Sequence, residues 1–155
     1  MRAAINPRGL VELAGNTSAF VRRAADRLDS ELIGWLTTVS PSGQPQSSPV
    51  WFAWTAGGNG SAGEVVIRSR PGAPRMANLA SNRWVAFNLN SDASGGDVVT
   101  FEGEAHLDGD LSADEAARYR TKYEPEVPGI GMTWDEFVAT YAAVVRVRIT
   151  RLRML

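Results

Sequence analysis

The sequence predicts a mainly β, antiparallel fold with helices at its edges, and three observations support this prediction. Six segments have the alternation, or the β-branched and aromatic content, that is typical of strands. Hairpin turns or short helices join these segments, in place of regular βαβ units. The chain has 155 residues, 44% hydrophobic and 21% charged, which is enough for one domain with its own core. We therefore expect a single domain over residues 1–155, with residues 1–15 as an N-terminal extension.

The predicted strands follow from periodicity and from turn residues. Ser40 to Gly43 predicts the turn of a hairpin, because proline fixes the backbone and glycine frees it. From Val99 to Leu107 apolar residues alternate with polar ones, which predicts one dry and one wet face. The glycine-rich segment 57–63 is expected to be a hairpin loop. The predicted strands, which we expect to close into a barrel without free edges, are 32–39, 49–54, 64–69, 83–90, 97–108 and 143–151.

Capping residues and helical spacing predict four short helices. The first runs from candidate caps at 16–18 to about residue 29. Its expected buried face comprises Phe20, Val21, Ala24, Ala25 and Leu28. Pro74 suits the first position of a second helix that continues through Ala80. The segments 112–115 and 133–136 have the spacing of capping boxes, and each predicts the start of a helix. The first helix precedes a Pro/Gly loop at 124–131, and the second follows it.

Composition and charge exclude several classes of protein. The formal net charge is −1, and the alternation of Arg146 and Arg148 indicates a charged strand face, so no nucleic-acid partner is expected. Cysteine is absent and His106 is the single histidine, which excludes disulfides and the usual zinc sites, so no metal is expected. The chain has no leader-like segment and no run of about 18 apolar residues, so we expect a cytoplasmic protein without a membrane span.

The densest cluster of candidate functional residues lies between Arg68 and Asn78. A strand is predicted to end there and a helix to begin, and the free N–H groups of a helix N-terminus favour a phosphate. The guanidinium groups of Arg68, Arg70 and Arg75 would add charge-assisted hydrogen bonds, and Ser69 would add a hydroxyl. The same spacing also suits a solvated turn with ordinary surface arginines, and the residues alone leave both interpretations open.

A second candidate is the polar run Gln46, Ser47 and Ser48, which leads into an apolar strand with Trp51 and Trp54. Such a segment can hydrogen-bond a planar heterocycle, or it can be a strand with aromatic cross-strand packing.

Other polar and aromatic residues have simpler interpretations. His106, Glu102 and Glu104 are expected on a solvated strand face. The residues Trp35, Trp84 and Trp134 are expected to be core or interface anchors.

Several segments, taken in order, resemble the pyridoxamine phosphate oxidase-like split-barrel superfamily. The combination is similar to the actinobacterial branch whose members use the deazaflavin coenzyme F420. The resemblance extends from about Leu32 to the C-terminus. The segments that carry it are 36–46, 49–52, 69–75, 78–79, 96–103, 130–133 and 146–153.

The resemblance implies a six-stranded antiparallel split β-barrel of the FMN-binding type and a two-fold homodimer with cofactor sites at its interface. Ser69 and Arg75 would hold the cofactor phosphate, helped by Arg70 and Asn78. The ring would be lined by Gln46, Ser47, Ser48, Ile67 and Arg68. Arginine stands at position 75 where the family usually has lysine, the chain ends in Met154-Leu155 where the family often has glycine and tryptophan, and loop 57–63 is longer than usual.

The activity implied is hydride transfer between F420 and a small organic substrate, by alignment in a dry pocket and without a named catalytic residue. The sequence leaves three alternatives. The first is an FMN-binding oxidase or reductase of the same fold. The second is a non-enzymatic flavin or deazaflavin carrier, and the third is a dimeric protein without a cofactor.

Overall fold

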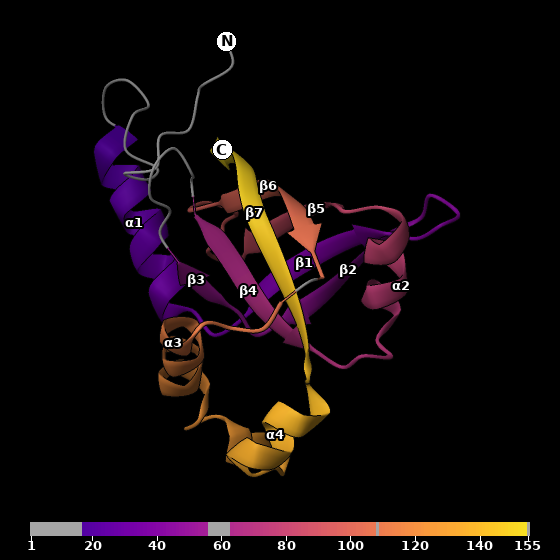
Figure 1. The fold of residues 1–155 in the computed structure, drawn as a ribbon. Helices are drawn as coiled ribbons and strands as arrows, with labels where there is room; N and C mark the ends of the chain where they lie inside the picture. The colour runs from indigo at the N-terminus through magenta and orange to yellow at the C-terminus, as the bar shows by residue number, and fades with distance from the viewer. Residues whose placement is uncertain (1–16, 56–62, 108, 155) are drawn as a thin grey trace.

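The computed structural model describes residues 17–55, 63–107 and 109–154, in which seven strands form one antiparallel sheet (Figure 1). The strand order is β2-β1-β5-β6-β7-β4-β3. In chain order the elements are α1 (Thr17–Ser30), β1 (Gly34–Val39), β2 (Pro45–Val50), β3 (Ala53–Thr55), β4 (Glu64–Ser69), α2 (Pro74–Ser81), β5 (Trp84–Leu89), β6 (Val99–His106), α3 (Ala113–Tyr123), η1 (Val127–Ile130), α4 (Trp134–Thr140) and β7 (Ala143–Met154). The mainly β prediction is confirmed, with one more strand than expected. The expected closure without free edges is wrong, because among the described strands β2 pairs only with β1 and β3 pairs only with β4.

The predicted single strand 49–54 is wrong, because the structure has two strands in this region, β2 and β3. The hairpin partner of β1 is β2, in which Pro45 lies opposite Val39, whereas β3 pairs with β4. Segment 45–49 looks like a loop in the sequence because it is polar and holds two prolines, and both features are tolerated on an exposed edge strand. Since β2 and β3 stand at opposite ends of the strand order, Trp51 and Phe52 connect the two ends, and the sheet curls back on itself.

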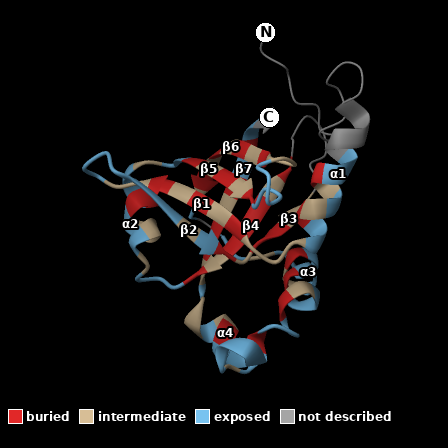
Figure 2. Ribbon diagram, turned by 180° about the vertical axis from the view of Figure 1, so that it is seen from behind, coloured by how far each residue is buried: buried red, intermediate tan, exposed pale blue. Residues whose placement is uncertain are grey.

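The core has two parts, one on each face of the curled sheet. Inside the curl lie large apolar side chains, among them Leu36, Phe52 and Phe87, each no more than 1% exposed. The second cluster fills the space between the outer face of the sheet and the helices α3 and α4, and Val66 and Tyr123 belong to it. In Figure 2 the buried residues follow the strands and the inner sides of the helices.

The helices lie close to where local sequence signals predicted them. Ala24 and Leu28 of α1 are buried as expected, while the side chains of Phe20 and Val21 lie outside the described residues. Both capping boxes are confirmed, at Ser112 and at Thr133. The loop predicted over 124–131 contains the short helix η1. The predicted N-terminal extension and most of the loop at 57–63 also lie outside the described residues.

Several strand bounds and one tryptophan differ from expectation. β6 begins at Val99 and not at Asp97, because Asp97 has a φ of 56° and its carboxylate pairs with Arg23 and Arg27 of α1. β7 continues to Met154, three residues beyond the predicted end. Trp84 is 61% exposed, so it is not a core residue of this chain. No helix in the described part of the chain is long and apolar enough to cross a membrane.

Candidate functional site

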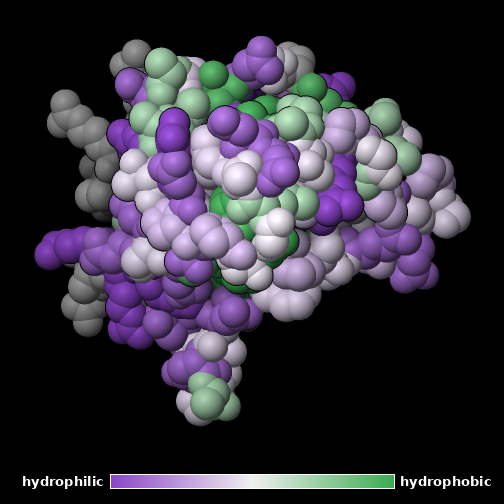
Figure 3. Space-filling model, turned by 90° about the horizontal axis from the view of Figure 1, so that it is seen from below, coloured by the Kyte–Doolittle hydropathy of each residue, from purple (hydrophilic) through white to green (hydrophobic). Residues whose placement is uncertain are grey.

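A pocket of about 300 Å³ brings together two of the predicted arginines and an aromatic wall. It opens where β2 and β4 approach α2 and α4. In Figure 1 α2 lies at the right of the sheet and α4 at the bottom. Seen from below, apolar side chains lie between hydrophilic ones near the middle of the face (Figure 3). The pocket is lined by Ile33, Pro49, Val50, Trp51, Arg68, Arg75, Ile130, Phe137 and Tyr141.

Arg68 enters the pocket because the strand alternation of β4 sends its side chain away from the core. Its neighbour Ile67 is fully buried inside the curl. The guanidinium of Arg68 lies 6.0 Å from the ring centre of Tyr119, and its Nη1 donates to the carbonyl oxygen of Tyr141 at 3.5 Å. Its Nε is buried and has no hydrogen-bond partner in the part of the chain that the structure describes. A buried donor without a partner is costly, so this N–H would gain from an acceptor.

Arg75 reaches the same pocket from the second position of α2. No ion pair or hydrogen bond holds its guanidinium among the residues described, and burial lowers its pKa, with Tyr141 and Tyr119 opposing that shift. The helix starts at Ala73-Pro74 without a side-chain cap, whereas α3 and α4 are both capped. A desolvated cation beside an uncapped helix N-terminus favours an anion.

Arg70 stands at the margin of the pocket. Its Nη2 donates to the hydroxyl of Tyr141 at 3.4 Å, and its guanidinium lies 5.1 Å from the centre of that ring. Neither Arg68, Arg70 nor Arg75 forms an ion pair with a described carboxylate. The segment therefore carries positive charge that is not compensated locally, and this is the property that an anion site requires.

An aromatic wall closes the other side of the pocket. Trp51 stacks on Tyr123 with 4.8 Å between ring centres and an interplanar angle of 9°, and it also contacts Phe137. The buried hydroxyl of Tyr123 accepts a hydrogen bond from the N–H of Phe52 at 2.7 Å, and burial raises its pKa. Because Tyr123 is held in this way, the tryptophan rests on a rigid support. The wall suits a flat, apolar part of a ligand.

Most of the other predicted site residues form a separate polar network. The side-chain amide of Asn78 donates to Thr38 at 2.9 Å and to Gln46 at 2.8 Å. Asn78 is 4% exposed, so this network fastens α2 to the ends of β1 and β2. Ser47 accepts a hydrogen bond from Thr37 at 3.1 Å. These bonds are within the chain, so a role of Gln46, Ser47 and Asn78 toward a cofactor stays a prediction.

Three further predicted residues lie outside the lining of the pocket. The side chain of Ile67 points into the core. Ser69 is 1% exposed, and its hydroxyl lies 3.4 Å from the carbonyl oxygen of Arg70. Ser48 is half-buried on β2 next to Pro49, which does line the pocket. The structure therefore brings Arg68 and Arg75 together, and it places the remaining predicted residues around them.

The sequence analysis missed Tyr141 and Phe137. They are four residues apart after the capping box at Thr133, and this spacing puts both rings on one helix face. Their rings stack with 4.9 Å between centres. The aromatic pair was therefore a usable signal. Trp54, the other tryptophan considered for this site, lines a different cavity.

The outer face of β6 is a charged strand face, as expected. Glu104 pairs with Arg83 at 3.3 Å and with Arg148, and His106 lies 4.0 Å from it. Glu102 pairs with Arg151 at 3.8 Å. The carboxylates on this face are thus engaged with arginines.

The sequence profile of the pyridoxamine 5'-phosphate oxidase family matches residues 20–154. None of the curated proteins matches the chain. A conserved hypothetical protein of Mycobacterium tuberculosis is similar in structure, with a TM-score of 0.63 and 23% identity over 98% of this chain and 86% of that chain. HutZ, the heme storage protein of Vibrio cholerae, has a TM-score of 0.58 and 17% identity over 86% and 92% of the two chains. An F420 reductase has a TM-score of 0.55 and 21% identity over 83% and 94%.

Proposed function

This chain belongs to the pyridoxamine 5'-phosphate oxidase family, and from that premise we propose that it is an oxidoreductase that binds coenzyme F420 in the pocket of Arg68 and Arg75. One observation carries the proposal: Arg68, whose buried Nε has no partner among the described residues, lines a pocket beside a second guanidinium that no described carboxylate neutralises. An F420 reductase of the same fold supports the choice of cofactor.

The residues present fit an anionic cofactor with a flat ring. F420 carries a phosphodiester and carboxylates, which match Arg68 and Arg75 in the pocket and Arg70 at its margin. Its tricyclic ring suits the wall formed by Trp51 and Phe137. A pocket of about 300 Å³ is at the lower end for small-molecule sites, so we expect part of the cofactor to lie against a second subunit of a homodimer.

The protein's part in the reaction is to bind, to orient and to exclude water. When bound, a deazaflavin supplies the carbon that donates or accepts hydride. Arg68 and Arg75 would fix the anionic groups, and the aromatic wall would keep water from the ring face. Alignment of a small organic substrate on that face requires no ionisable residue. We therefore assign no catalytic acid or base.

FMN is the nearest alternative, because it also combines a phosphate with a tricyclic ring. Heme is a further one, since HutZ shares the fold. The single histidine of this chain, His106, lies beside Glu104 on β6 and does not line the pocket, which argues against a histidine-ligated heme there. A carrier without turnover and a dimeric protein without a cofactor complete the alternatives.

Parallel titrations of the full chain with F420, FMN and hemin test the proposal, followed through quenching of tryptophan fluorescence because Trp51 lines the pocket. We expect selective, saturable binding of F420. Arg75→Ala should weaken that binding by more than about tenfold, since it removes a charge-assisted contact. Arg23→Ala is the matched control, because Arg23 is exposed on α1 and pairs with Asp97 at 2.8 Å.

The other outcomes are equally informative. A preference for FMN or hemin assigns the chain to those cofactors, and binding of none of the three refutes the proposal. Saturable F420 binding that Arg75→Ala leaves unchanged refutes this pocket as its site. F420 binding without turnover across a panel of small electrophilic substrates favours a carrier.

A further inference from the structure

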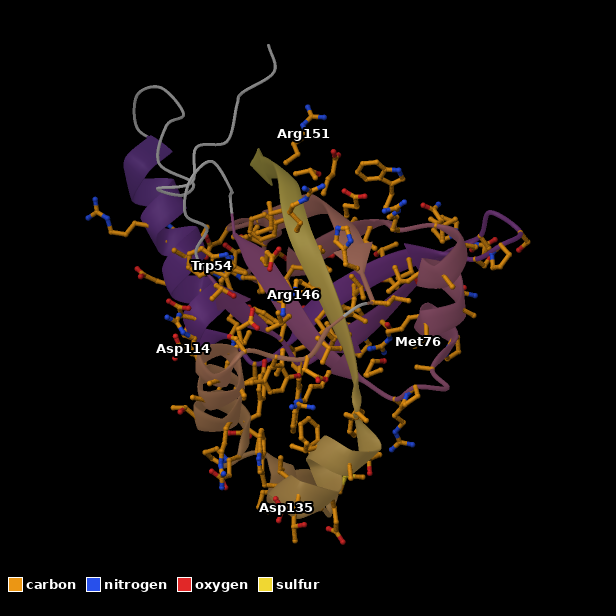
Figure 4. All side chains as sticks on the ribbon, viewed as in Figure 1. Trp54, Met76, Asp114, Asp135, Arg146 and Arg151 are labelled. Carbon is orange, nitrogen blue, oxygen red and sulfur yellow. The ribbon has the colours of Figure 1, made fainter. Side chains whose placement is uncertain are left out.

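A second cavity, of about 400 Å³, lies between the end of α1, the edge strand β3 and one face of α3. In Figure 4 the labelled Trp54 lies where α1 meets β3. The pocket of Arg68 and Arg75 shares no lining residue with this cavity. The lining consists of Leu28, Asp29, Ala53, Trp54, Ala117, Arg118, Thr121 and Lys122.

Two residues that line this cavity, Trp54 and Lys122, carry hydrogen-bond donors that the described residues do not fully satisfy. The indole Nε1 of Trp54 is buried and has no partner among the residues that the structure describes. A buried indole N–H normally finds an acceptor. The ammonium of Lys122 has three N–H groups and donates to the carbonyl oxygen of Leu28 at 3.0 Å, and its nitrogen lies 4.0 Å from the centre of the Phe52 ring.

The charge of the cavity is positive. Lys122 and Arg118 face a single carboxylate, that of Asp29, and neither cation forms an ion pair in the described segments. Burial lowers the pKa of Lys122 to about 8, while Asp29 and Glu31 act in the opposite direction. An anion placed next to Lys122 would offset this loss of hydration.

Lys122 is also the one lysine in the chain, whose other cationic side chains are arginines. An ammonium is a compact point charge that suits a single small anionic group, whereas guanidinium favours larger bidentate partners. Apart from Thr121, the remainder of the lining is apolar, with Leu28, Ala53 and Ala117. The volume exceeds that of a bare inorganic ion and is in the range of small-molecule sites.

We propose that this cavity binds a small carboxylate with an apolar body, whose two oxygens accept hydrogen bonds from Lys122 Nζ and Trp54 Nε1. The apolar body lies against Ala53 and Ala117. The proposal does not depend on the F420 assignment, because the cavity and its donors are separate from the first pocket. A phosphate or a polyanion is a poorer match, because Asp29 would repel additional charge.

Calorimetric titration of the full chain with benzoate tests the proposal, with benzamide as the neutral probe of the same shape. We expect one benzoate per chain, and much weaker binding of benzamide. Trp54→Phe keeps the ring and removes the N–H, so it should weaken benzoate binding about fivefold to tenfold. Lys122→Met should weaken it more than about tenfold, and Lys122→Arg should restore part of the affinity.

Chemical modification provides a measurement that needs no variant. Since Lys122 is the single lysine, an amine-acylating reagent followed by peptide mass spectrometry reports on its side chain directly. Benzoate should slow this acylation, and benzamide should not. Benzoate should also bind at least about tenfold more weakly at about pH 9.5 than at about pH 7, because Lys122 loses its proton over this range. The other charged groups around Lys122 are Asp29, Glu31 and Arg118.

Three results would overturn the proposal. One is the absence of saturable benzoate binding up to about 10 mM, which lies beyond the weakest affinities typical of specific sites. A second is benzoate affinity that neither Trp54→Phe nor Lys122→Met changes. A third is equal binding of benzoate and benzamide, which would show an apolar cavity without an anion site. If Lys122→Met fails to fold, the acylation and pH measurements on the unaltered chain still decide.

Discussion

Replacing Arg68 with methionine should change protein stability and cofactor binding in opposite directions. Methionine keeps the apolar stem of the side chain and removes the buried Nε that has no described partner. Relief of an unsatisfied buried donor is worth about 1–3 kcal/mol. The variant also loses the contact with the ring of Tyr119 at 6.0 Å, worth about 0.5–1 kcal/mol, and a weak hydrogen bond of 3.5 Å to Tyr141. The net expectation is a gain of about 1 kcal/mol in the free energy of unfolding of the protein alone.

Thermal unfolding with and without F420 measures both effects in one assay. Without cofactor, the Tm of Arg68→Met should rise by about 2–4 °C, the shift expected per kcal/mol for a domain of this size. At an F420 concentration of about 100 times the wild-type Kd, the wild type should gain about 2.7 kcal/mol. A variant that binds about tenfold more weakly gains only about 1.4 kcal/mol, so its advantage in Tm disappears.

Arg23→Met is the control for this experiment. Arg23 is exposed and pairs with Asp97, and exposed ion pairs contribute little. Its Tm should change by no more than about 2 °C, and its response to F420 should equal that of the wild type. A lower Tm for Arg68→Met without cofactor would refute the reasoning on the buried Nε. An unchanged response to F420 in that variant would refute the role of Arg68 in the site.

Two further predictions concern stability. Tyr123→Phe leaves the buried N–H of Phe52 without its acceptor at 2.7 Å, so chemical denaturation should show a loss of about 2–3 kcal/mol in the free energy of unfolding. A loss below about 0.5 kcal/mol would contradict the role of this hydroxyl at the β2–β3 corner. Arg146 holds the pKa of Glu115 below its usual 4.5, so this carboxylate stabilises the fold above about pH 4.5 and the contribution is lost as the pH falls through the lower folded value. Glu115→Gln should flatten the acid side of the stability profile in that window, and a profile as steep as that of the wild type would argue against it.

Local patterns were sufficient for the helices but not for strand β2. The capping boxes at Ser112 and Thr133 need only residues within one turn, and both form as predicted. In segment 45–49 the local signals, two prolines and a polar run, favour a loop. The segment is a strand because β1 offers it a hydrogen-bonding edge. An exposed edge strand requires no apolar residues, and prolines are tolerated in it because not every backbone N–H has to donate to a neighbouring strand. Such information comes from the partner strand and is not contained in the segment.

The site was predictable to the extent that chain proximity determines it. Arg68 and Arg75 are close in sequence around one turn, and they meet in one pocket. The role of Asn78 was not predictable in the same way. It is tied to Thr38 and Gln46, which come from a distant hairpin, so its amide is engaged in fastening α2. Chain proximity alone cannot distinguish a side chain that faces a pocket from one that fastens the helix beside it.

Charge pairing separates the structural arginines from the candidate functional ones. Arg146 of β7 is neutralised by Glu64 of β4 and Glu115 of α3, partners more than thirty residues away. The arginines at 68 and 75 have no such partner in the described chain, and they line a pocket. The sequence could not decide between an anion site and a solvated turn, because both need arginines at the same spacing. What distinguishes them is whether the fold brings a carboxylate from a distant part of the chain next to the arginines, and strand register and helix packing determine that. The same reasoning applies to Lys122, which lies half-buried at a second cavity and forms no ion pair with a described carboxylate. Cations that form no ion pair with a described carboxylate are thus found at both cavities, where an anionic ligand would supply a direct partner.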